Sequence, residues 1–239
     1  MAELELNPEL DIESLANEYA RDKKVRIRNV LAPESAERLA ACLETETPYR
    51  VVMVNAEGQP VMIDTPQIPW GSPEVRATVQ RAQNEFSFLY QAYPMYEAYK
   101  EDRHPDHMLH RAVAFMNSAP VINLFRTVTG HADIEFTDAQ AARYEPGCFL
   151  KTHTDRVVGH RRRAAYVLGF TRRWSIDWGG LLIFMNKQGQ ITHGDKPGFN
   201  TLDIFSTPRD HAVTQVARFA GAPRQSITGW ARASLEASD

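Results

Sequence analysis

From Ile134 to the end of the chain, the sequence consists of short β-like runs separated by Gly and Pro. The segment 210–216 is typical, because its apolar and polar residues alternate as they do along a half-buried strand. A core built from such runs must be mainly β. This conclusion applies only from Ile134 onward, because the preceding residues contain longer segments with helical spacing.

The first 133 residues are predicted to be a mixed helical and β region. Apolar residues at helical spacing, with proline punctuation, predict helices over 11–23, 33–43, 72–99 with a break at Pro94, and 106–128 with an interruption at Pro120. Strands are predicted at 25–30 and in a hairpin over 49–64, whose turn contains Gly58. The economical arrangement is a single domain, 1–239, in which a support region, 1–133, carries a mainly β core, 134–239.

The segment 72–99 is rich in aromatic residues. They are Phe86, Phe88, Tyr90, Tyr93, Tyr96 and Tyr99. Such rings can line a peptide groove, but a helix packed on the β core explains them more simply. We therefore predict core packing.

The pattern His-x-Asp occurs four times, at His104/Asp106, His131/Asp133, His153/Asp155 and His193/Asp195. Residues i and i+2 of a strand share a face, so the two side chains of one copy can hold one metal ion. Only the third copy is followed at a suitable distance by a further histidine in a strand-like run, His211, 56 residues after Asp155. We predict that His153, Asp155 and His211 are metal ligands, and that the other three copies are surface histidines.

Two histidines and one carboxylate are the ligand set that holds ferrous iron on one face and leaves the opposite positions free for chemistry. Arg224 lies 13 residues beyond His211, with Ser226 close behind it. A planar, permanently charged guanidinium can hold a carboxylate through two hydrogen bonds. The pattern therefore indicates an iron site that takes a carboxylate cosubstrate.

These residues belong to a longer ordered series. Its pieces are Tyr144 to Gly147, His153 to Asp155, Trp178 to Leu181, Asn200 to Phe205, His211 to Val213 and Arg224 to Trp230. Over roughly 134–235 the series resembles the prolyl 4-hydroxylase-like branch of the 2-oxoglutarate/iron(II) oxygenases. The resemblance implies a double-stranded β-helix, or jelly roll, as the core. It also implies that the ligands bind Fe(II) and that 2-oxoglutarate and O2 are used.

The resemblance further implies that Arg224 binds the 5-carboxylate of 2-oxoglutarate, assisted by Ser226 and Tyr144. Trp230 stands where such enzymes keep an aromatic residue near the substrate pocket. Nucleic-acid demethylases of the wider superfamily have a second arginine at that place, so a nucleic-acid substrate is not expected. The chain also departs from the common Tyr-Leu-Asn triplet, because 167–170 reads Val-Leu-Gly-Phe.

The expected function is hydroxylation of a C–H bond, with a prolyl residue in a protein or peptide as the best guess. A free amino acid or other small molecule is the alternative substrate. A metal-binding jelly-roll module without 2-oxoglutarate chemistry is the alternative class, and it would have no need for Arg224 with Tyr144.

Composition limits the remaining possibilities. A net charge of −3 gives no argument for nucleic acid or a membrane surface. The longest apolar runs are too short to span a bilayer, and the acidic N-terminus does not resemble a signal peptide. Only two cysteines occur, Cys42 and Cys148, which agrees with a reducing compartment. We therefore expect a cytoplasmic protein, and leave its oligomeric state open.

Six arginines cluster around the metal ligands in sequence: Arg156, Arg161, Arg162, Arg163, Arg172 and Arg173. Such a cluster attracts an acidic partner or pairs with the chain's own 30 acidic residues. We favour ion pairing within the chain.

Overall fold

The computed structural model describes residues 3–156 and 161–233. The helices are α1 (Ile12–Asp22), α2 (Pro33–Thr45), α3 (Pro73–Arg81), α4 (Met95–Lys100), α5 (Met108–Met116), α6 (Ala119–Thr129) and the short 3-10 helix η1 (Ile176–Trp178). The strands before the predicted core are β1 (Lys24–Arg28), β2 (Arg50–Val54), β3 (Pro60–Ile63) and β4 (Phe88–Tyr93). The later strands are β5 (Ile134–Thr137), β6 (Gln140–Tyr144), β7 (Phe149–Thr154), β8 (Arg162–Phe170), β9 (Leu182–Met185), β10 (Ile191–Asp195), β11 (Phe199–Ser206), β12 (Asp210–Val213) and β13 (Arg224–Ala233).

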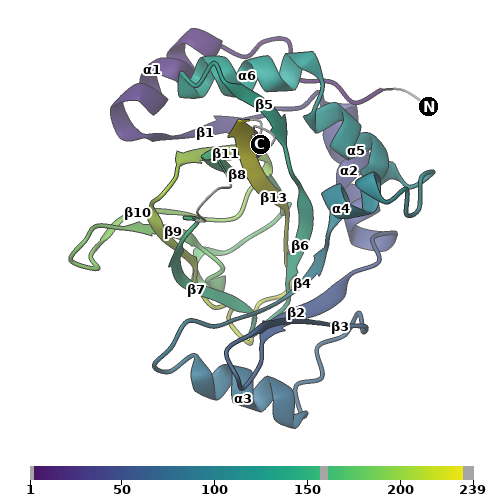
Figure 1. Cartoon of the computed structure of the whole chain (residues 1–239), viewed down its shortest axis with the longest axis vertical. Coiled ribbons are helices and arrows are strands. Elements are labelled where there is room, and N and C mark those ends of the chain that lie inside the picture. Colours follow the sequence, from purple (N-terminus) through teal and green to yellow (C-terminus); the bar gives the residue numbers. More distant parts are fainter. Residues whose placement is uncertain (1–2, 157–160, 234–239) are drawn as a thin grey trace, which may run out of the picture.

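All the strands belong to one curled antiparallel sheet. Its main path runs β1-β11-β8-β13-β6-β4-β7-β12-β9-β10, with β2 and β3 attached at β4 and β5 attached at β13. The curl brings the β7, β9 and β12 end of the path to face β8 and β13 (Figure 1). This mainly β, helix-supported jelly-roll architecture confirms the predicted fold class.

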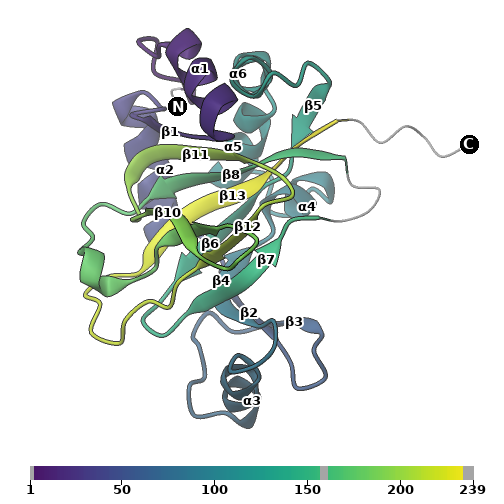
Figure 2. The ribbon, with the colours of Figure 1, turned by 90° about the vertical axis from the view of Figure 1, so that its left-hand side faces the viewer.

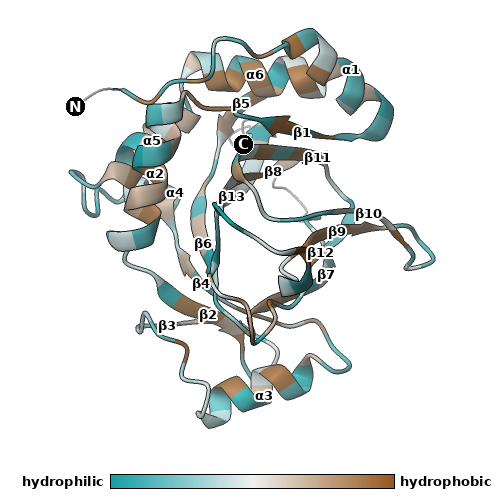
Figure 3. Ribbon diagram, turned by 180° about the vertical axis from the view of Figure 1, so that it is seen from behind, coloured by the Kyte–Doolittle hydropathy of each residue, from teal (hydrophilic) through white to brown (hydrophobic). Residues whose placement is uncertain are grey.

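The helices lie on the outer face of the curled sheet. Figure 2 shows α1 and α6 above β1, β11 and β8, and Figure 3 shows apolar residues alternating with polar ones along α6. The buried face of α6 joins the largest hydrophobic cluster, which includes Phe125, Tyr166, Leu168, Ile204 and Ile227. Burial of this apolar surface fixes which face of β8, β11 and β13 points outward. The intervening residues of these strands must point inward.

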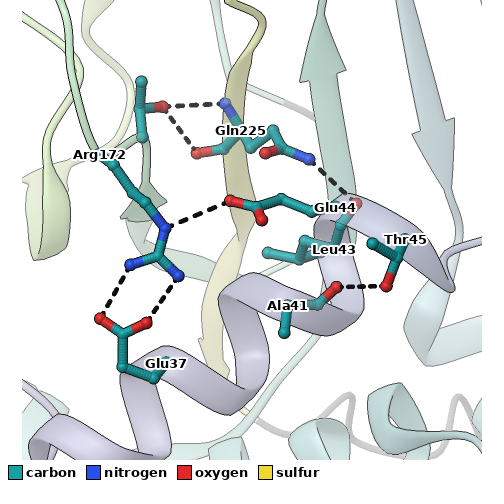
Figure 4. A network of polar contacts seen from close by, with 8 residues as sticks. Glu37, Ala41, Leu43, Glu44, Thr45, Arg172 and Gln225 are labelled. Atoms are coloured by element: carbon teal, nitrogen blue, oxygen red, sulfur yellow. Dashed lines mark hydrogen bonds and ion pairs between the residues drawn. The ribbon is translucent and has the colours of Figure 1, made fainter.

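A polar network joins α2 to the back of this sheet (Figure 4). Arg172, just after β8, pairs with Glu37 at 2.6 Å and with Glu44 at 3.4 Å. The side chain of Gln225 on β13 donates to the carbonyl oxygen of Leu43 at 2.9 Å. The exposed ion pairs add little stability, but the buried Gln225 bond fixes the end of α2 against β13.

The predicted helices at 11–23 and 33–43 and the predicted hairpin are confirmed by α1, α2 and the β2–β3 pair. The predicted helix over 106–128 is divided into α5 and α6. Ser118 takes the extended backbone of a helix N-cap and Pro120 stands in the first turn of α6, where proline is favourable.

The helix predicted over 72–99, with a break at Pro94, is confirmed at its two ends by α3 and α4 but is wrong between them. Only 73–81 and 95–100 are helical, and 88–93 forms β4, which lies between β6 and β7 in the sheet. Alternate residues of β4 face opposite sides of the sheet. Pairing on both edges outweighs the local helical spacing, because a strand in that place satisfies the backbone groups of two neighbours.

Within the described residues no helix has the length and apolar character needed to cross a bilayer.

Gly179 provides a test of backbone strain in the motif Trp178 to Leu181. Its φ of 66° and ψ of −139° lie in a region open almost only to glycine, and an added Cβ would meet the carbonyl oxygen of Gln215 at 2.1 Å. We expect Gly179→Ala to lower the free energy of unfolding by at least about 3 kcal/mol. Chemical denaturation measures the change.

Gly189→Ala is the matched control, because Gly189 also has a positive φ, 76°, but nothing lies within 4 Å of an added Cβ. It should cost only about 1 kcal/mol. Equal losses in the two variants would contradict the close approach at Gly179.

Candidate active site

The three predicted metal ligands meet at the pairing of β7 with β12. His153 is on β7, Asp155 follows that strand directly, and His211 is on β12. The antiparallel register places His211 opposite His153. Residues separated by more than fifty positions in the sequence therefore come together through one strand pair.

The ligand atoms of these side chains converge. The Asp155 carboxylate oxygens lie 3.5 Å from Nε2 of His153 and 3.5 Å from Nε2 of His211. The two imidazole rings are 4.2 Å apart between centroids. One ligand atom from each residue lies within 4.8 Å of the others. This geometry suits a single ion held on one face.

Backbone carbonyl oxygens orient both imidazoles. Nδ1 of His153 lies 3.0 Å from the oxygen of Lys151, and Nδ1 of His211 lies 2.8 Å from that of Arg209. A carbonyl oxygen only accepts hydrogen bonds, so each Nδ1 carries the proton and each Nε2 keeps its lone pair. Contacts of this kind orient metal-binding histidines in proteins.

The charges in the site also favour metal binding. Burial and the neighbouring His153 lower the pKa of His211, which keeps its imidazole neutral. Burial of the Asp155 carboxyl opposes ionisation, but its contacts with the two neighbouring imidazoles outweigh the effect of burial and lower its pKa. A carboxylate and a neutral imidazole are the forms that bind a metal.

The predicted cosubstrate residues lie next to the metal ligands. Arg224 on β13 pairs in register with Tyr144 on β6, and its guanidinium lies 5.2 Å from the centroid of the tyrosine ring. Ser226 lies two residues further along β13, on the same face. The structure thus brings Arg224, Tyr144 and Ser226 together, as the sequence predicts.

Arg224 is a buried cation without an ion-pair partner among the described residues. It is 4% exposed, and its Nη1 makes no hydrogen bond. Burial lowers the pKa of its guanidinium. The nearby carboxylate of Asp203 is bound to Arg26 at 2.6 Å. Buried charges need a partner, so the site fits an anionic ligand.

Ser226 adds a second unsatisfied group. It is 1% exposed, and its Oγ has no hydrogen-bond partner among the residues that the structure describes. Together, Nη1 of Arg224 and Oγ of Ser226 offer two donors to a carboxylate. The residues present therefore fit the distal carboxylate of a 2-oxoacid.

One cavity of about 550 Å³ contains both sets of residues. Trp230 lines it. The guanidinium of Arg162 stacks on Trp230 at 3.5 Å from the ring centroid and donates to the backbone oxygen of Asp155 at 2.9 Å. The carboxylate of Asp138 accepts a hydrogen bond from the backbone N–H of Trp230 at 2.7 Å, which helps to hold Trp230 in place.

An aromatic series forms another wall, and three of its members, Phe86, Phe88 and Tyr90, were predicted to pack in the core. Phe86, Phe88, Tyr90 and Tyr144 lie in contact, with ring centroids 5.9, 5.6 and 4.8 Å apart along the series. All four line the cavity, and Phe86 at its outer end is 45% exposed. The period-two spacing of 86, 88 and 90 was the signal that a strand presents these rings to one face.

The other His-x-Asp copies do not form a three-ligand cluster with a further residue among those described. His193, for example, pairs only with Asp195, at 2.8 Å. A second cluster, Cys42, Glu46 and His107, has ligand atoms within 4.8 Å of one another. Both ring nitrogens of His107 already lie 3.2 Å from backbone groups, so that cluster is less suited to a metal.

The basic residues around the ligands are partly neutralised. Arg163 pairs with Asp133, and Arg172 pairs with Glu37 and Glu44. Ion pairing within the chain, the favoured interpretation, therefore accounts for these two arginines.

Comparisons with known proteins indicate which class of protein the chain resembles. Residues 139–232 match the family model of the 2OG-Fe(II) oxygenase superfamily. This match confirms the predicted resemblance, and oxygenases of that superfamily use Fe(II), 2-oxoglutarate and O2. A search of curated proteins found no matching sequence.

Three solved structures share the fold. A prolyl-4-hydroxylase from Pseudomonas putida is 19% identical, with a TM-score of 0.56, and the match covers 93% of this chain and 99% of that one. An oxidoreductase of the 2OG-Fe(II) oxygenase family from Burkholderia pseudomallei is 13% identical, with a TM-score of 0.60, covering 98% and 99%. A Trichoplax adhaerens prolyl hydroxylase, in complex with a peptide fragment of the hypoxia inducible factor oxygen degradation domain, is 14% identical, with a TM-score of 0.59, covering 93% and 89%.

The geometry predicts which histidine matters for metal binding. We expect His153→Ala and Asp155→Ala each to weaken Fe(II) binding by more than about 100-fold, because two ligands remain. An anaerobic titration with Fe(II) measures the affinity.

His193→Ala is the control, because it removes a histidine from another His-x-Asp copy. It should leave Fe(II) binding unchanged, and an equal loss there would show that the wrong copy has been assigned.

Proposed function

We propose that this protein is an Fe(II)- and 2-oxoglutarate-dependent dioxygenase that hydroxylates a C–H bond. The observation that carries the proposal is a pair of buried, unpartnered donors, Nη1 of Arg224 and Oγ of Ser226, in the cavity that contains the three metal ligands. A module that only binds a metal has no use for a buried cation there. The family match and the shared fold support the same class.

Each residue has a defined task in this proposal. His153 and His211 bind the iron through Nε2 and Asp155 binds it through its carboxylate. Arg224 holds the 5-carboxylate of 2-oxoglutarate through its planar guanidinium, assisted by Ser226 and Tyr144. With O2, the bound iron and 2-oxoglutarate supply the oxidant that removes hydrogen from an unactivated carbon.

Apolar side chains pack against His211 on one side of the candidate metal site. Phe205 packs edge-on against His211 at 4.8 Å between ring centroids. The ring of Phe184 lies 6.3 Å from that of His211. Leu182 and Phe184 belong to the same small hydrophobic cluster as Phe205. Exclusion of water strengthens the electrostatic interactions inside and limits side reactions.

The proposed substrate is a prolyl residue in a protein or peptide. The aromatic wall from Phe86 to Tyr144 gives the cavity an apolar surface that suits a prolyl ring, and Phe86 at its outer end is exposed to solvent, where a longer chain can leave the cavity. A free amino acid or another small molecule is the alternative, because a cavity of about 550 Å³ also accommodates it. Trp230, with Arg162 stacked on it, is the proposed substrate contact opposite the aromatic wall.

We further propose that residues 1–239 act as one oxygenase domain and work in the cytoplasm. Cys42 and Cys148 are free and buried. A reducing compartment suits free thiols and keeps iron ferrous.

Arg224 gives the sharpest test of cosubstrate binding. We expect Arg224→Ala to raise the KM for 2-oxoglutarate by about 100-fold or more, because a charge-assisted two-pronged contact is lost. The KM of Arg224→Lys for 2-oxoglutarate should lie between those of Arg224→Ala and the unmodified protein, since a lysine keeps the charge but not the planar guanidinium. Succinate release at varied 2-oxoglutarate concentration measures both.

Fe(II) binding by Arg224→Ala should match that of the unmodified protein, and exposed Arg76→Ala should change neither quantity. An unchanged 2-oxoglutarate dependence in Arg224→Ala would contradict the assignment of this residue.

The substrate proposal has its own test. A proline-containing peptide should stimulate succinate release and gain one oxygen atom by mass spectrometry, whereas free L-proline should give neither result. The reverse outcome would assign the enzyme to small molecules. Phe86→Ala should reduce peptide turnover more than Tyr99→Ala, which removes a similarly exposed ring away from the cavity.

A further inference from the structure

A second cavity lies on the opposite face of the strands that carry Tyr90 and Tyr144. Gln91 and Arg143 alternate with those tyrosines along β4 and β6, so they face the other side of the sheet. The two residues are paired directly across the strands. They line a cavity of about 630 Å³, which is far larger than a single water needs. This cavity is separated from the candidate active site by the sheet itself.

The cavity wall contains two arginines, Arg143 and Arg218, and two glutamates, Glu44 and Glu145. Nε of Arg143 is neutralised by Glu145 at 2.7 Å. Glu44, also in the wall, is turned toward Arg172 at 3.4 Å (Figure 4). Arg218 has no ion-pair partner in the part of the chain that the structure describes. Its guanidinium lies over the ring of Trp70, 4.5 Å from the centroid. An anionic group is therefore the complementary ligand feature.

Gln91 indicates a second feature of the ligand, a hydrogen-bond donor. It is 4% exposed, and its Nε2 donates to the carbonyl oxygen of Pro66 at 2.5 Å. Its Oε1 is buried and makes no hydrogen bond with any other part of the described chain. An unpaired buried acceptor carries a desolvation cost that a ligand with an N–H or O–H group would remove.

The wall that carries Trp70 is built by close packing. Gly147 lies so near the indole that an added Cβ would be 2.6 Å from it, which only glycine permits. Ile68 and Pro146 complete an apolar side of the cavity. The cavity thus combines an aromatic and apolar surface with polar groups that include an arginine without an ion-pair partner among the described residues and the unpartnered oxygen of Gln91, as small-molecule sites do.

We propose that this cavity is a second binding site, for a small carboxylate that also carries hydrogen-bond donors, of the free amino acid type. The carboxylate pairs with Arg218, and the ammonium group of the ligand donates to Oε1 of Gln91. The site goes beyond the proposed oxygenase function and needs neither iron nor 2-oxoglutarate.

The experiment uses the full chain without added metal or 2-oxoglutarate. Each of the twenty standard L-amino acids is titrated by calorimetry up to about 10 mM, which detects millimolar dissociation constants. We expect at least one to bind. Arg218→Ala and Gln91→Leu should each weaken that binding by about tenfold, since each removes one ligand contact. Arg218 is exposed, so its replacement does not threaten the fold.

Arg224→Ala is the matched control, because it removes an arginine from the other cavity. Binding should persist in this variant. Absence of binding by any of the amino acids, or binding that Arg218→Ala and Gln91→Leu leave unchanged, would overturn the proposal. Binding that is lost in Arg224→Ala alone would also overturn it, because the ligand would then occupy the candidate active site. None of these outcomes depends on whether the protein is an oxygenase.

Discussion

The pairing of β7 with β12 is the interaction on which the candidate active site depends. It sets His211 opposite His153, and Asp155 completes the set at the end of β7. Neither strand is long, and each is held by its other neighbour: β7 by β4 and β12 by β9. A slip of one residue would turn His153 or His211 to the opposite face. The register is therefore a condition for any metal binding here.

Because side chains alternate along each strand, one face of the sheet packs on the helices and the other lines the cavity. On β13, Gln225 and Ile227 face the helices, where they bond to α2 and join the large core. Arg224 and Ser226 face the cavity. Packing of the helices on the outer face thus determines which side chains point into the cavity, although the helices do not contact those side chains. Stability comes from the outer, apolar layer, and this allows an unpaired buried cation to remain on the inner face.

Much of this arrangement could be predicted from the sequence. Most of the proposed metal ligands and cosubstrate residues lie in strands, and His-x-Asp is informative because residues i and i+2 share a face. The helices α1 and α2 followed from regular spacing, and their first turns carry favourable residues. Local patterns suffice where the decisive interactions are local.

The features that the sequence did not predict depend on contacts between distant segments of the chain. Strand β4 was predicted as helix, because its place between β6 and β7 depends on hydrogen bonds to distant segments. The aromatic wall was therefore missed with it. The binding of Asp203 to Arg26, which leaves Arg224 for a ligand, joins β11 to β1 across 177 residues of sequence. No local pattern reveals which carboxylate neutralises which arginine.

The most direct test of the central claim is an anaerobic titration of the protein with Fe(II) and 2-oxoglutarate, followed in the visible spectrum. We predict a weak charge-transfer band that requires both additions, disappears in His153→Ala, and needs much more 2-oxoglutarate in Arg224→Ala. Admission of O2 should then release succinate. Iron binding without the band would contradict the account, because the metal ligands would be present but Arg224 would have no cosubstrate to hold.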